Sequence, residues 1–354
     1  MSDRPVMIAA GGTGGHVFPA LAVAEQLIQR GVPVLWIGTQ RGIESRLVPE
    51  AGYEIDWITV SGLRGKGVLK LLRAPFDIAV ACVQALVIMR RRNPRAVLGM
   101  GGFVSGPGGL VAWLTGRPLV IHEQNAVPGT TNRLLARIAS RILEATPGTF
   151  AETRGALCTG NPVRHTLHQL APVAVASANA PLRVLVLGGS QGARALNRVV
   201  PVALADLERC DVWHQCGRDG EARTTQRYRE QGVEARVDAF IDDMAAAYGW
   251  ADIVVCRSGA MTVAELAASG RGAILVPYPH AIDDHQTANG SALVRHGAAL
   301  MLPEAQFDAS ALRSMLIELR DNRTRVAEMA LASRALARPD AAADVATLVA
   351  EVSK

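Results

Sequence analysis

The apolar positions of the chain gather in short runs, and longer amphipathic segments separate one run from the next. Ten runs have the length of strands: 6–10, 34–38, 55–60, 96–100, 118–124, 183–189, 212–217, 237–241, 252–256 and 273–277. Many of them are apolar on both faces, as strands buried inside a parallel sheet are. Their alternation with helix-length segments predicts an α/β fold in which crossover helices join parallel strands.

Two segments repeat the same theme of strand, glycine-rich turn and helix. The first is VMIAAGGTGGHVFPALAVAEQLIQRG at 6–31, and the second is RVLVLGGSQGARALNRVV at 183–200. An Ala- and Pro-rich break lies between them at 161–182, and 354 residues are many for one core. We therefore expect two Rossmann-like, doubly wound domains. Sheets of this kind bind ligands at the carboxyl ends of their strands, so two facing domains would enclose a deep cleft.

The glycine-rich turns are suited to phosphate. Glycine lets the backbone approach a ligand closely, and the N-terminus of the following helix attracts an anion. A third glycine cluster lies at 99–109, although its part at 106–109 is equally typical of close packing between helix and strand. Counted from Gly12 and Gly14, the third glycine of the dinucleotide fingerprint is replaced by Val17, which argues against a nicotinamide or flavin cofactor. Pro19 suits the first position of the helix after the turn.

Composition narrows the class of protein. Hydrophobic residues make up 49% of the chain, which excludes a disordered protein, and a net charge of +5 favours anionic ligands or an acidic membrane surface. An RNA-binding pattern of aromatic and basic residues is missing from the sequence, so we expect no nucleic-acid partner. Five cysteines without a C-x-x-C motif indicate reduced thiols in a cytoplasm. The longest apolar stretch, 78–89, is too short to span a bilayer, and no signal peptide is evident.

The segment 252–290 has the highest density of chemically useful side chains. The run 252–256 ends at a Ser258-Gly259 turn, and AMTVAELAAS at 260–269 predicts a helix that carries Glu265. A carboxylate there can bind two ribose hydroxyls, although it could equally be a solvated helix side chain. Gln286 and Asn289 offer amides that suit sugar hydroxyls, or that simply cap a helix.

A basic and apolar segment at 61–95 raises the question of a membrane. An apolar patch ringed by cations is typical of a peripheral protein on anionic lipid, whereas a core helix with a solvated basic face is the alternative. The residues expected at the membrane are Leu69, Leu72, Phe76, Lys66, Lys70 and Arg73, with further cations at 90–92 and 95.

Eight motifs, in this order, resemble the MurG family of bacterial lipid-linked N-acetylglucosaminyltransferases. They are GGTGGHVFPALAVA, SGLRGKG, GMGGFVSGPGG, HEQNAVPG, GNPVR, GGSQGARALN, FIDDM and CRSGAMTVAE. The resemblance implies a GT-B fold and inverting transfer of N-acetylglucosamine from UDP-N-acetylglucosamine to undecaprenyl-diphosphate-linked N-acetylmuramyl pentapeptide. It also implies a peripheral protein on the cytoplasmic face of the cell membrane, with other cell-wall synthesis proteins as further candidate partners.

The resemblance further divides the chain and assigns residues. A first domain at 1–163 plus about 337–354 would bind acceptor and membrane, and a second at 164–336 would bind the UDP-sugar. Gly14, Gly15, Gly101 and Gly102 fall near the acceptor diphosphate. The donor-site positions are Thr13, Gly14, Gly15, Asn125, Arg164, Ser190, Ile241, Ala260, Met261, Thr262, Val263, Ala264, Glu265 and Gln286.

Inverting transfer needs a base on the acceptor hydroxyl. His16 is the candidate because a neutral imidazole is available near pH 7, with Glu123 as its rival. The other role open to His16 is positioning of the loop or substrate. In each of the pairs Asp242-Asp243 and Asp283-Asp284, the two residues are neighbours in the sequence, so their carboxylates should point in different directions and would not hold one metal ion together. We expect no metal and no other cofactor.

Three alternatives accompany this interpretation. A nicotinamide-dependent oxidoreductase would need the missing glycine fingerprint. A different UDP-sugar enzyme, either an epimerase or a diacylglycerol glycosyltransferase, would keep the fold and change the chemistry. A non-catalytic scaffold would keep the glycine-rich turns and bind a nucleotide sugar but catalyse no reaction. The combination of His16, Glu265 and three glycine-rich turns argues against this alternative.

Overall fold

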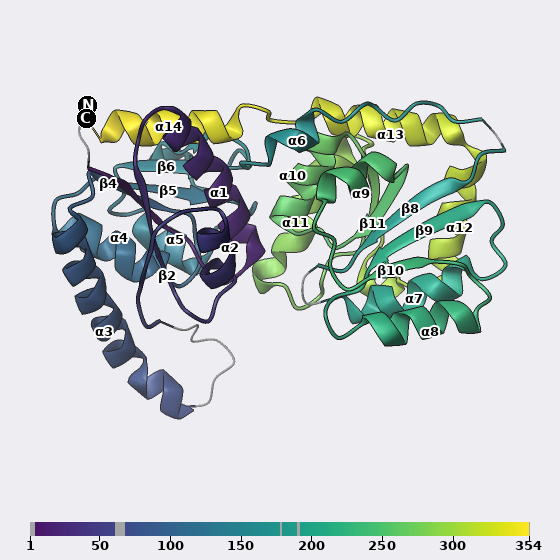
Figure 1. Cartoon of the computed structure of the whole chain (residues 1–354). Coiled ribbons are helices and arrows are strands. Elements are labelled where there is room, and N and C mark those ends of the chain that lie inside the picture. The colour runs from purple at the N-terminus through teal and green to yellow at the C-terminus, as the bar shows by residue number, and fades with distance from the viewer. Residues whose placement is uncertain (1–3, 61–67, 178, 190–191, 354) are drawn as a thin grey trace. The chain divides into compact units, whose positions relative to one another are not determined.

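The computed structural model describes residues 4–60, 68–177, 179–189 and 192–353. The chain forms two compact units: unit 1 comprises 1–164 and 338–354, and unit 2 comprises 165–337. Each unit contains one sheet whose strands all run parallel (Figure 1). Each is described by itself below.

The sheet of unit 1 has the order β3-β2-β1-β4-β5-β6-β7 among the described residues. Its central strand, β1, pairs with β2 in the register Ile8 to Trp36 and with β4 in the register Ile8 to Leu98. The strands are β1 (Val6–Ala9), β2 (Val34–Gly38), β3 (Ile55–Trp57), β4 (Ala96–Gly99), β5 (Leu119–Glu123), β6 (Arg141–Glu144) and β7 (Leu157–Cys158).

Helices cover both faces of this sheet because alternate residues of β1 point to opposite sides. Met7 and Ala9 lie in a core with α3, α4 and α5, whereas Val6 and Ile8 lie in a core with α1 and α14. The helices of unit 1 are α1 (Gly14–Gln29), α2 (Glu44–Glu50), α3 (Val68–Arg92), α4 (Ser105–Leu114), α5 (Thr130–Leu135) and α14 (Ala341–Val352), with a short 3-10 turn, η1 (Glu152–Arg154).

Helix α14 belongs to unit 1 although 173 residues of unit 2 precede it in the chain. It packs on α1, as Figure 1 shows, and buries Val345, Ala346 and Val349 completely. The core of unit 1 is therefore completed by residues from both ends of the described chain.

The sheet of unit 2 has the order β10-β9-β8-β11-β12-β13 among the residues described. The strand order reverses between β8 and β11, which is where open α/β sheets bind their ligands. The strands are β8 (Leu182–Leu187), β9 (Cys210–Gln215), β10 (Arg236–Asp238), β11 (Ile253–Cys256), β12 (Gly272–Leu275) and β13 (Ala299–Met301).

Two groups of helices pack around this second sheet. Helix α7 contacts α8 and α12, and α10 contacts α6, α9, α11 and α13. Their bounds are α6 (His165–His168), α7 (Arg194–Leu204), α8 (Glu221–Glu230), α9 (Met244–Trp250), α10 (Ala260–Ser269), α11 (His285–Arg295), α12 (Ala309–Asp321) and α13 (Arg323–Ala335), with η2 (Ile282–Asp284) and η3 (Glu304–Gln306).

The ten predicted strands are all present, and the sheets contain three further strands that were not predicted. β6 and β7 contain only two apolar residues each, too few for a clear apolar run, whereas β13 lies in the apolar segment 298–302 that the prediction overlooked. The predicted start of the first helix at Pro19 is wrong, because α1 begins at Gly14. The helix contains Pro19 in its second turn, where the missing N–H removes one helical hydrogen bond. Within the described residues, none of the helices is both long and apolar enough to span a bilayer.

Candidate functional site

Two glycine turns of unit 1 pack against each other around His16. The first turn leads from β1 into α1, and the second leads from β4 into α4. A Cβ atom on Gly101 would lie 2.7 Å from His16 Nδ1, and one on Gly102 would lie 2.3 Å from the carbonyl oxygen of Gly11. Both glycines also have positive φ, at 96° and 80°. The glycines at 101 and 102 are therefore required for the two turns to close on the imidazole.

A chain of hydrogen bonds behind His16 fixes its ring. His16 Nδ1 lies 3.1 Å from Gln124 Oε1, and Gln124 Nε2 lies 3.1 Å from His122 Nδ1. His122 Nε2 in turn lies 3.0 Å from the carbonyl oxygen of Gly160. His122 and Gln124 are almost completely buried. His16, at the outer end of this series of hydrogen bonds, is half-buried.

These hydrogen bonds determine which nitrogen of each imidazole ring carries the proton. Burial lowers the pKa of His122 to about 4, so its ring is neutral and has one N–H. That N–H must be on Nε2, because a carbonyl oxygen such as that of Gly160 only accepts. His122 Nδ1 then accepts from the Gln124 amide, which leaves Gln124 Oε1 to accept from His16 Nδ1. Neutral His16 therefore has a lone pair on Nε2, as a general base requires.

Glu123 is enclosed by donors. Its Oε1 accepts from the backbone and side-chain nitrogens of Asn125, and its Oε2 accepts from the Gly129 N–H and Asn132 Nδ2, all at 3.0 Å. The residue is 2% exposed. With both oxygens engaged, this carboxylate holds the loop from Gln124 to Gly129 in shape.

A second buried carboxylate supports the first glycine turn. Glu44, at the start of α2, is fully buried and accepts from the Gly12 N–H at 2.9 Å. It also accepts from Thr39, at 3.0 Å from the backbone nitrogen and 2.7 Å from the hydroxyl. A Cβ on Gly11 would lie 2.5 Å from Glu44 Oε1, and Gly42 is just as crowded. The residue thus anchors the turn that presents His16.

The remaining predicted residues of unit 1 lie around the same strand ends. Thr13 precedes α1, Gly14 and Gly15 form its first turn, and Asn125 follows β5. Arg164 lies over the ring of Phe18, 4.6 Å from its centroid. Asn161, in the same segment as Arg164, donates to the Gln124 carbonyl at 3.1 Å.

In unit 2, the predicted nucleotide residues lie at the start of α10. The helix begins at Ala260 as expected, and residues 260–265 are half-buried. Tyr248 is fully buried, and its hydroxyl donates to Glu265 Oε2 at 3.2 Å. Burial raises the pKa of Tyr248 well above its usual value, so the phenol stays protonated. Glu265 is thereby oriented by a side chain from α9.

Three other positions complete this part of the site. Ile241 is buried just before α9, and Gln286 Oε1 accepts from the Tyr278 N–H at 2.9 Å. Ser190 lies outside the described residues. Asp243 accepts from the Ala246 N–H as the cap of α9. Within the described ranges, no group of three or more His, Cys, Asp or Glu side chains is arranged to hold a metal ion.

An apolar face lies on α3 and α4, which pack together in unit 1 (Figure 1). Phe76, Val83 and Val87 on α3 are 66%, 61% and 59% exposed, and Trp113 and Leu114 on α4 are 51% and 65% exposed. We call these five residues the α3/α4 face. The expected position Arg73 is also exposed. Lys66 lies outside the described residues, and the side chains of Leu69, Lys70 and Leu72 are not described.

Sequence reasoning missed the residues that orient the functional ones. His122 and Gln124 stand in the HEQN motif beside the predicted Glu123, but a histidine inside an apolar strand gives no sign of its partners. Glu44 and Tyr248 are far in sequence from the groups they hold, at separations of 32 and 17 residues. Only the position of Glu44 directly after a strand and a glycine-containing turn could have singled it out.

Comparison with known families covers most of the chain. The profile of the glycosyltransferase family 28 N-terminal domain matches residues 6–144, within unit 1. The profile of the glycosyltransferase family 28 C-terminal domain matches residues 183–345, most of which lie in unit 2.

Curated relatives extend this similarity over nearly full length. A UDP-N-acetylglucosamine–N-acetylmuramyl-(pentapeptide) pyrophosphoryl-undecaprenol N-acetylglucosamine transferase from Methylococcus capsulatus is 54% identical over 350 residues, and one from Nitrosococcus oceani is 56% identical over 353. Each alignment covers 98% of both chains. The crystal structure of Acinetobacter baumannii MurG is 41% identical, with a TM-score of 0.81 and coverage of 98% and 99%. A kitacinnamycin glycosyltransferase, 18% identical with a TM-score of 0.74, shares the fold.

Proposed function

This chain belongs to the MurG family within glycosyltransferase family 28, and we propose that it transfers N-acetylglucosamine from UDP-N-acetylglucosamine to the 4-hydroxyl of undecaprenyl-diphosphate-linked N-acetylmuramyl pentapeptide. The reaction converts lipid I to lipid II in peptidoglycan synthesis. Its fold class is GT-B, with two Rossmann-like units. The observation that carries the chemistry is the half-buried His16, whose ring is fixed so that Nε2 can accept a proton.

His16 is the general base of this proposal. Its Nε2 takes the proton of the acceptor hydroxyl while that oxygen attacks C1 of the donor sugar. The bond from C1 to the β-phosphate oxygen breaks, UDP leaves with the electron pair, and the configuration at C1 inverts. The engaged and buried carboxylate of Glu123 favours a positioning role for that residue. The glycine turn 11–15 and Gly101 and Gly102 offer backbone groups to the acceptor diphosphate.

Most of the proposed donor positions belong to unit 2, and Asn125 and Arg164 belong to unit 1. Glu265, oriented by Tyr248, binds the ribose hydroxyls, and Ile241 meets the uracil through its backbone. Residues 260–264 at the N-terminus of α10 surround the nucleotide, and Gln286 and Asn125 meet the sugar. Ser190 and Arg164 are assigned to the diphosphate. A guanidinium and helix N-termini can stabilise the charge that develops on departing UDP, so the mechanism needs no metal ion.

The α3/α4 face brings the enzyme to its lipid-linked acceptor. Its exposed apolar side chains, with Arg73 and the basic end of α3 nearby, suit a peripheral contact with anionic lipid on the cytoplasmic face of the membrane. Other cell-wall synthesis proteins are further candidate partners.

The test is transfer of radiolabelled N-acetylglucosamine to a short-chain lipid-diphosphate muramyl pentapeptide in the presence of EDTA. We expect a labelled β-1,4-linked product, and we expect His16→Gln to abolish most of it while UDP binding persists. UDP binding by the unaltered protein without any transfer would instead favour the scaffold alternative. Epimerised donor without acceptor, or label on diacylglycerol, would favour another UDP-sugar enzyme.

A further inference from the structure

A cavity of about 590 Å³ lies in unit 2 between α7 and α8, with the turn after β9 at its base. This volume is within the range of small-molecule sites. Of the residues described, those that line it come from the turn after β8 (Gly192), α7, the β9–α8 turn, α8 and η3. Of the proposed donor positions, Ile241, Ala260 to Glu265 and Gln286 are not among them. Gly192 does line it and stands two positions after Ser190 in the sequence, so an experiment must distinguish this cavity from the donor diphosphate site.

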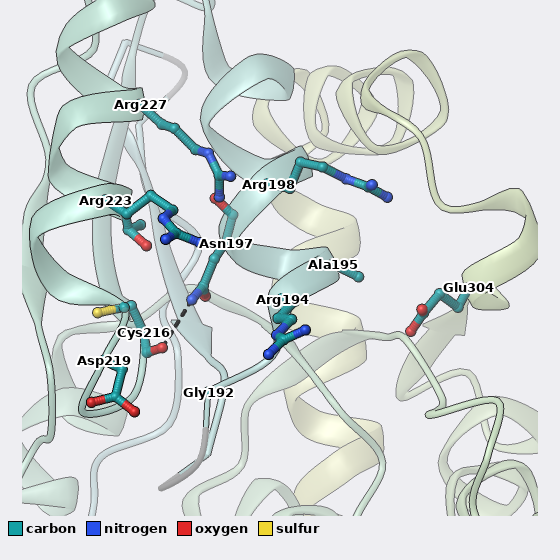
Figure 2. A pocket seen from close by; sticks show the side chains of 12 residues that line it. Gly192, Arg194, Ala195, Asn197, Arg198, Cys216, Asp219, Arg223, Arg227 and Glu304 are labelled. Carbon is teal, nitrogen blue, oxygen red and sulfur yellow. Dashed lines mark hydrogen bonds between the residues drawn. The ribbon is translucent and has the colours of Figure 1, made fainter.

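The cavity is strongly basic. Arg194 and Arg198 on α7 and Arg223 and Arg227 on α8 all line it. Figure 2 shows the Arg223 and Arg227 side chains pointing from α8 toward α7 and Asn197, with Arg194 at the start of α7, whereas the Arg198 side chain points away from α8. No ion pair is found for these four arginines within the described part of the chain.

The acidic residues that line the cavity are too few to neutralise its arginines. Glu304 lines the cavity but is paired with Arg257 at 2.5 Å. Asp219 is exposed in the turn after β9. Four arginines therefore line the cavity with two acidic residues, one of which is already paired. A planar guanidinium can donate two parallel hydrogen bonds to a phosphate group.

A buried polar network gives the cavity a fixed floor. Asn197 Nδ2 donates to the Cys216 carbonyl at 2.9 Å, which Figure 2 marks, and Asn197 Oδ1 lies 3.1 Å from His214 Nε2. His214 Nδ1 lies 2.8 Å from the Tyr228 hydroxyl. Because burial lowers the pKa of His214 to about 3, the ring is neutral, donates through Nε2 and accepts from Tyr228. The network ties β9 to both helices that carry the arginines.

The backbone around the floor is equally constrained. A Cβ on Gly192 would lie 2.3 Å from the Cys216 carbonyl oxygen, and one on Gly220 would lie 2.5 Å from the same atom. Arg227 Nη1 also donates to the Asn197 carbonyl at 3.1 Å. The arginines thus project from a preorganised frame, which lowers the entropy lost when a ligand binds.

We propose that this cavity between α7 and α8 is a binding site for a soluble, phosphate-bearing small molecule, separate from the donor nucleotide site. The two guanidiniums of α8 and that of Arg194 bind the phosphate groups, and the volume leaves room for a group beyond a diphosphate. The proposal does not depend on the transfer reaction, because it rests on charge and geometry within unit 2.

The test is calorimetric titration of the full chain with inorganic pyrophosphate after saturation with UDP. We expect pyrophosphate to bind in the presence of UDP and Arg223→Glu to weaken that binding about tenfold or more, since it replaces a donor with a repelling charge. The matched control is Arg229→Glu, which makes the same charge change at an exposed position of α8 outside the cavity. It should retain binding within about twofold.

Three results would overturn the proposal. Competition between pyrophosphate and UDP for one site would assign the arginines to the donor pocket. Equal weakening by Arg223→Glu and Arg229→Glu would show attraction to net charge alone. No pyrophosphate binding, together with Arg223-dependent binding to phosphatidylglycerol vesicles, would assign the patch to a lipid surface.

Discussion

His16 and Glu265, the proposed base and the proposed ribose-binding residue, illustrate how neighbouring side chains fix the orientation of a candidate functional group. The first is given a defined tautomer by Gln124, and the second is oriented by a buried tyrosine. Neither neighbour needs to touch substrate. Each reduces the number of orientations that the functional group would otherwise sample, which is the advantage of a preorganised site.

Substitution of His16 and of Glu265 should have different kinetic effects. We expect His16→Ala to lower kcat about a hundredfold or more while the KM for the donor changes little, because a base acts on the transition state. Glu265→Ala should mainly raise the KM for the donor. Steady-state kinetics with both substrates varied measures the two effects. Equal losses in kcat and KM for both variants would contradict this division of roles.

Gln124 should control the pH dependence of the reaction. In Gln124→Glu, a carboxylate faces His16 and stabilises its protonated form, so the acidic limb of the pH–rate profile should move to higher pH. Gln124→Leu should lower kcat about tenfold without such a move. Gln29→Glu makes the same charge change at the exposed end of α1 and serves as control. An unchanged limb in Gln124→Glu would show that the amide has only a structural role.

At the scale of elements, the turns at the carboxyl ends of β1, β2 and β4 depend on one another. Glu44, from the start of α2, holds the turn after β1, and the second turn closes on the first where Gly102 meets Gly11. A change in one turn should therefore affect the others.

Glu44→Gln tests this dependence. The amide nitrogen would face backbone N–H donors, so we expect the free energy of unfolding to fall by about 1–3 kcal/mol. We also expect kcat to fall, because His16 follows the turn. Urea denaturation and initial rates measure the two quantities. Glu50→Gln is the control, since Glu50 is an exposed residue of α2 that pairs with Arg46 at the surface. If it had the same effect, the turn would not be the cause.

The α3/α4 face should determine membrane binding. Phe76→Ser with Val83→Ser removes two exposed apolar side chains from α3, and we expect binding to phosphatidylglycerol vesicles to fall about tenfold. Transfer to a short-chain soluble acceptor should stay near normal. Leu331→Ser, at a position 61% exposed on α13, is the control. Co-sedimentation that is unaffected by the double substitution would rule out this face.

At the scale of the molecule, two buried histidines make stability depend on pH. Burial lowers the pKa of His122 to about 4 and that of His214 to about 3, from 6.5. Unfolding restores the ordinary value, so below pH 6.5 the unfolded chain binds protons that the folded chain does not. Each histidine should therefore lower the free energy of unfolding by about 1.4 kcal/mol per pH unit as pH falls through this window.

Urea denaturation between pH 7 and pH 4.5 measures that slope. His214→Gln should flatten it, whatever its effect on stability at pH 7, whereas His296→Gln at an exposed position should leave it unchanged. A slope that does not respond to His214→Gln would contradict the assignment of a neutral buried ring.

The sequence predicts the architecture better than the site. The apolar runs identify the central strands because a buried parallel strand needs apolar residues on both faces, whereas β7 is a two-residue edge strand whose residues are exposed, so it has no such run. The motifs single out His16 and Glu265 as candidates. Gln124, Tyr248 and Glu44 are not, because their roles come from contacts between segments that only the folded sheet brings together.

The path of the chain through unit 1 has a consequence for synthesis on the ribosome. The apolar surface of α1 is covered by Val345, Ala346 and Val349, which are translated only after all of unit 2. At about 5–20 residues per second, that delay is roughly 10–35 s. During this interval the nascent unit 1 exposes the surface that α14 will cover. Unit 1 is therefore the first unit to begin synthesis, but its fold is completed only after unit 2 has been synthesised.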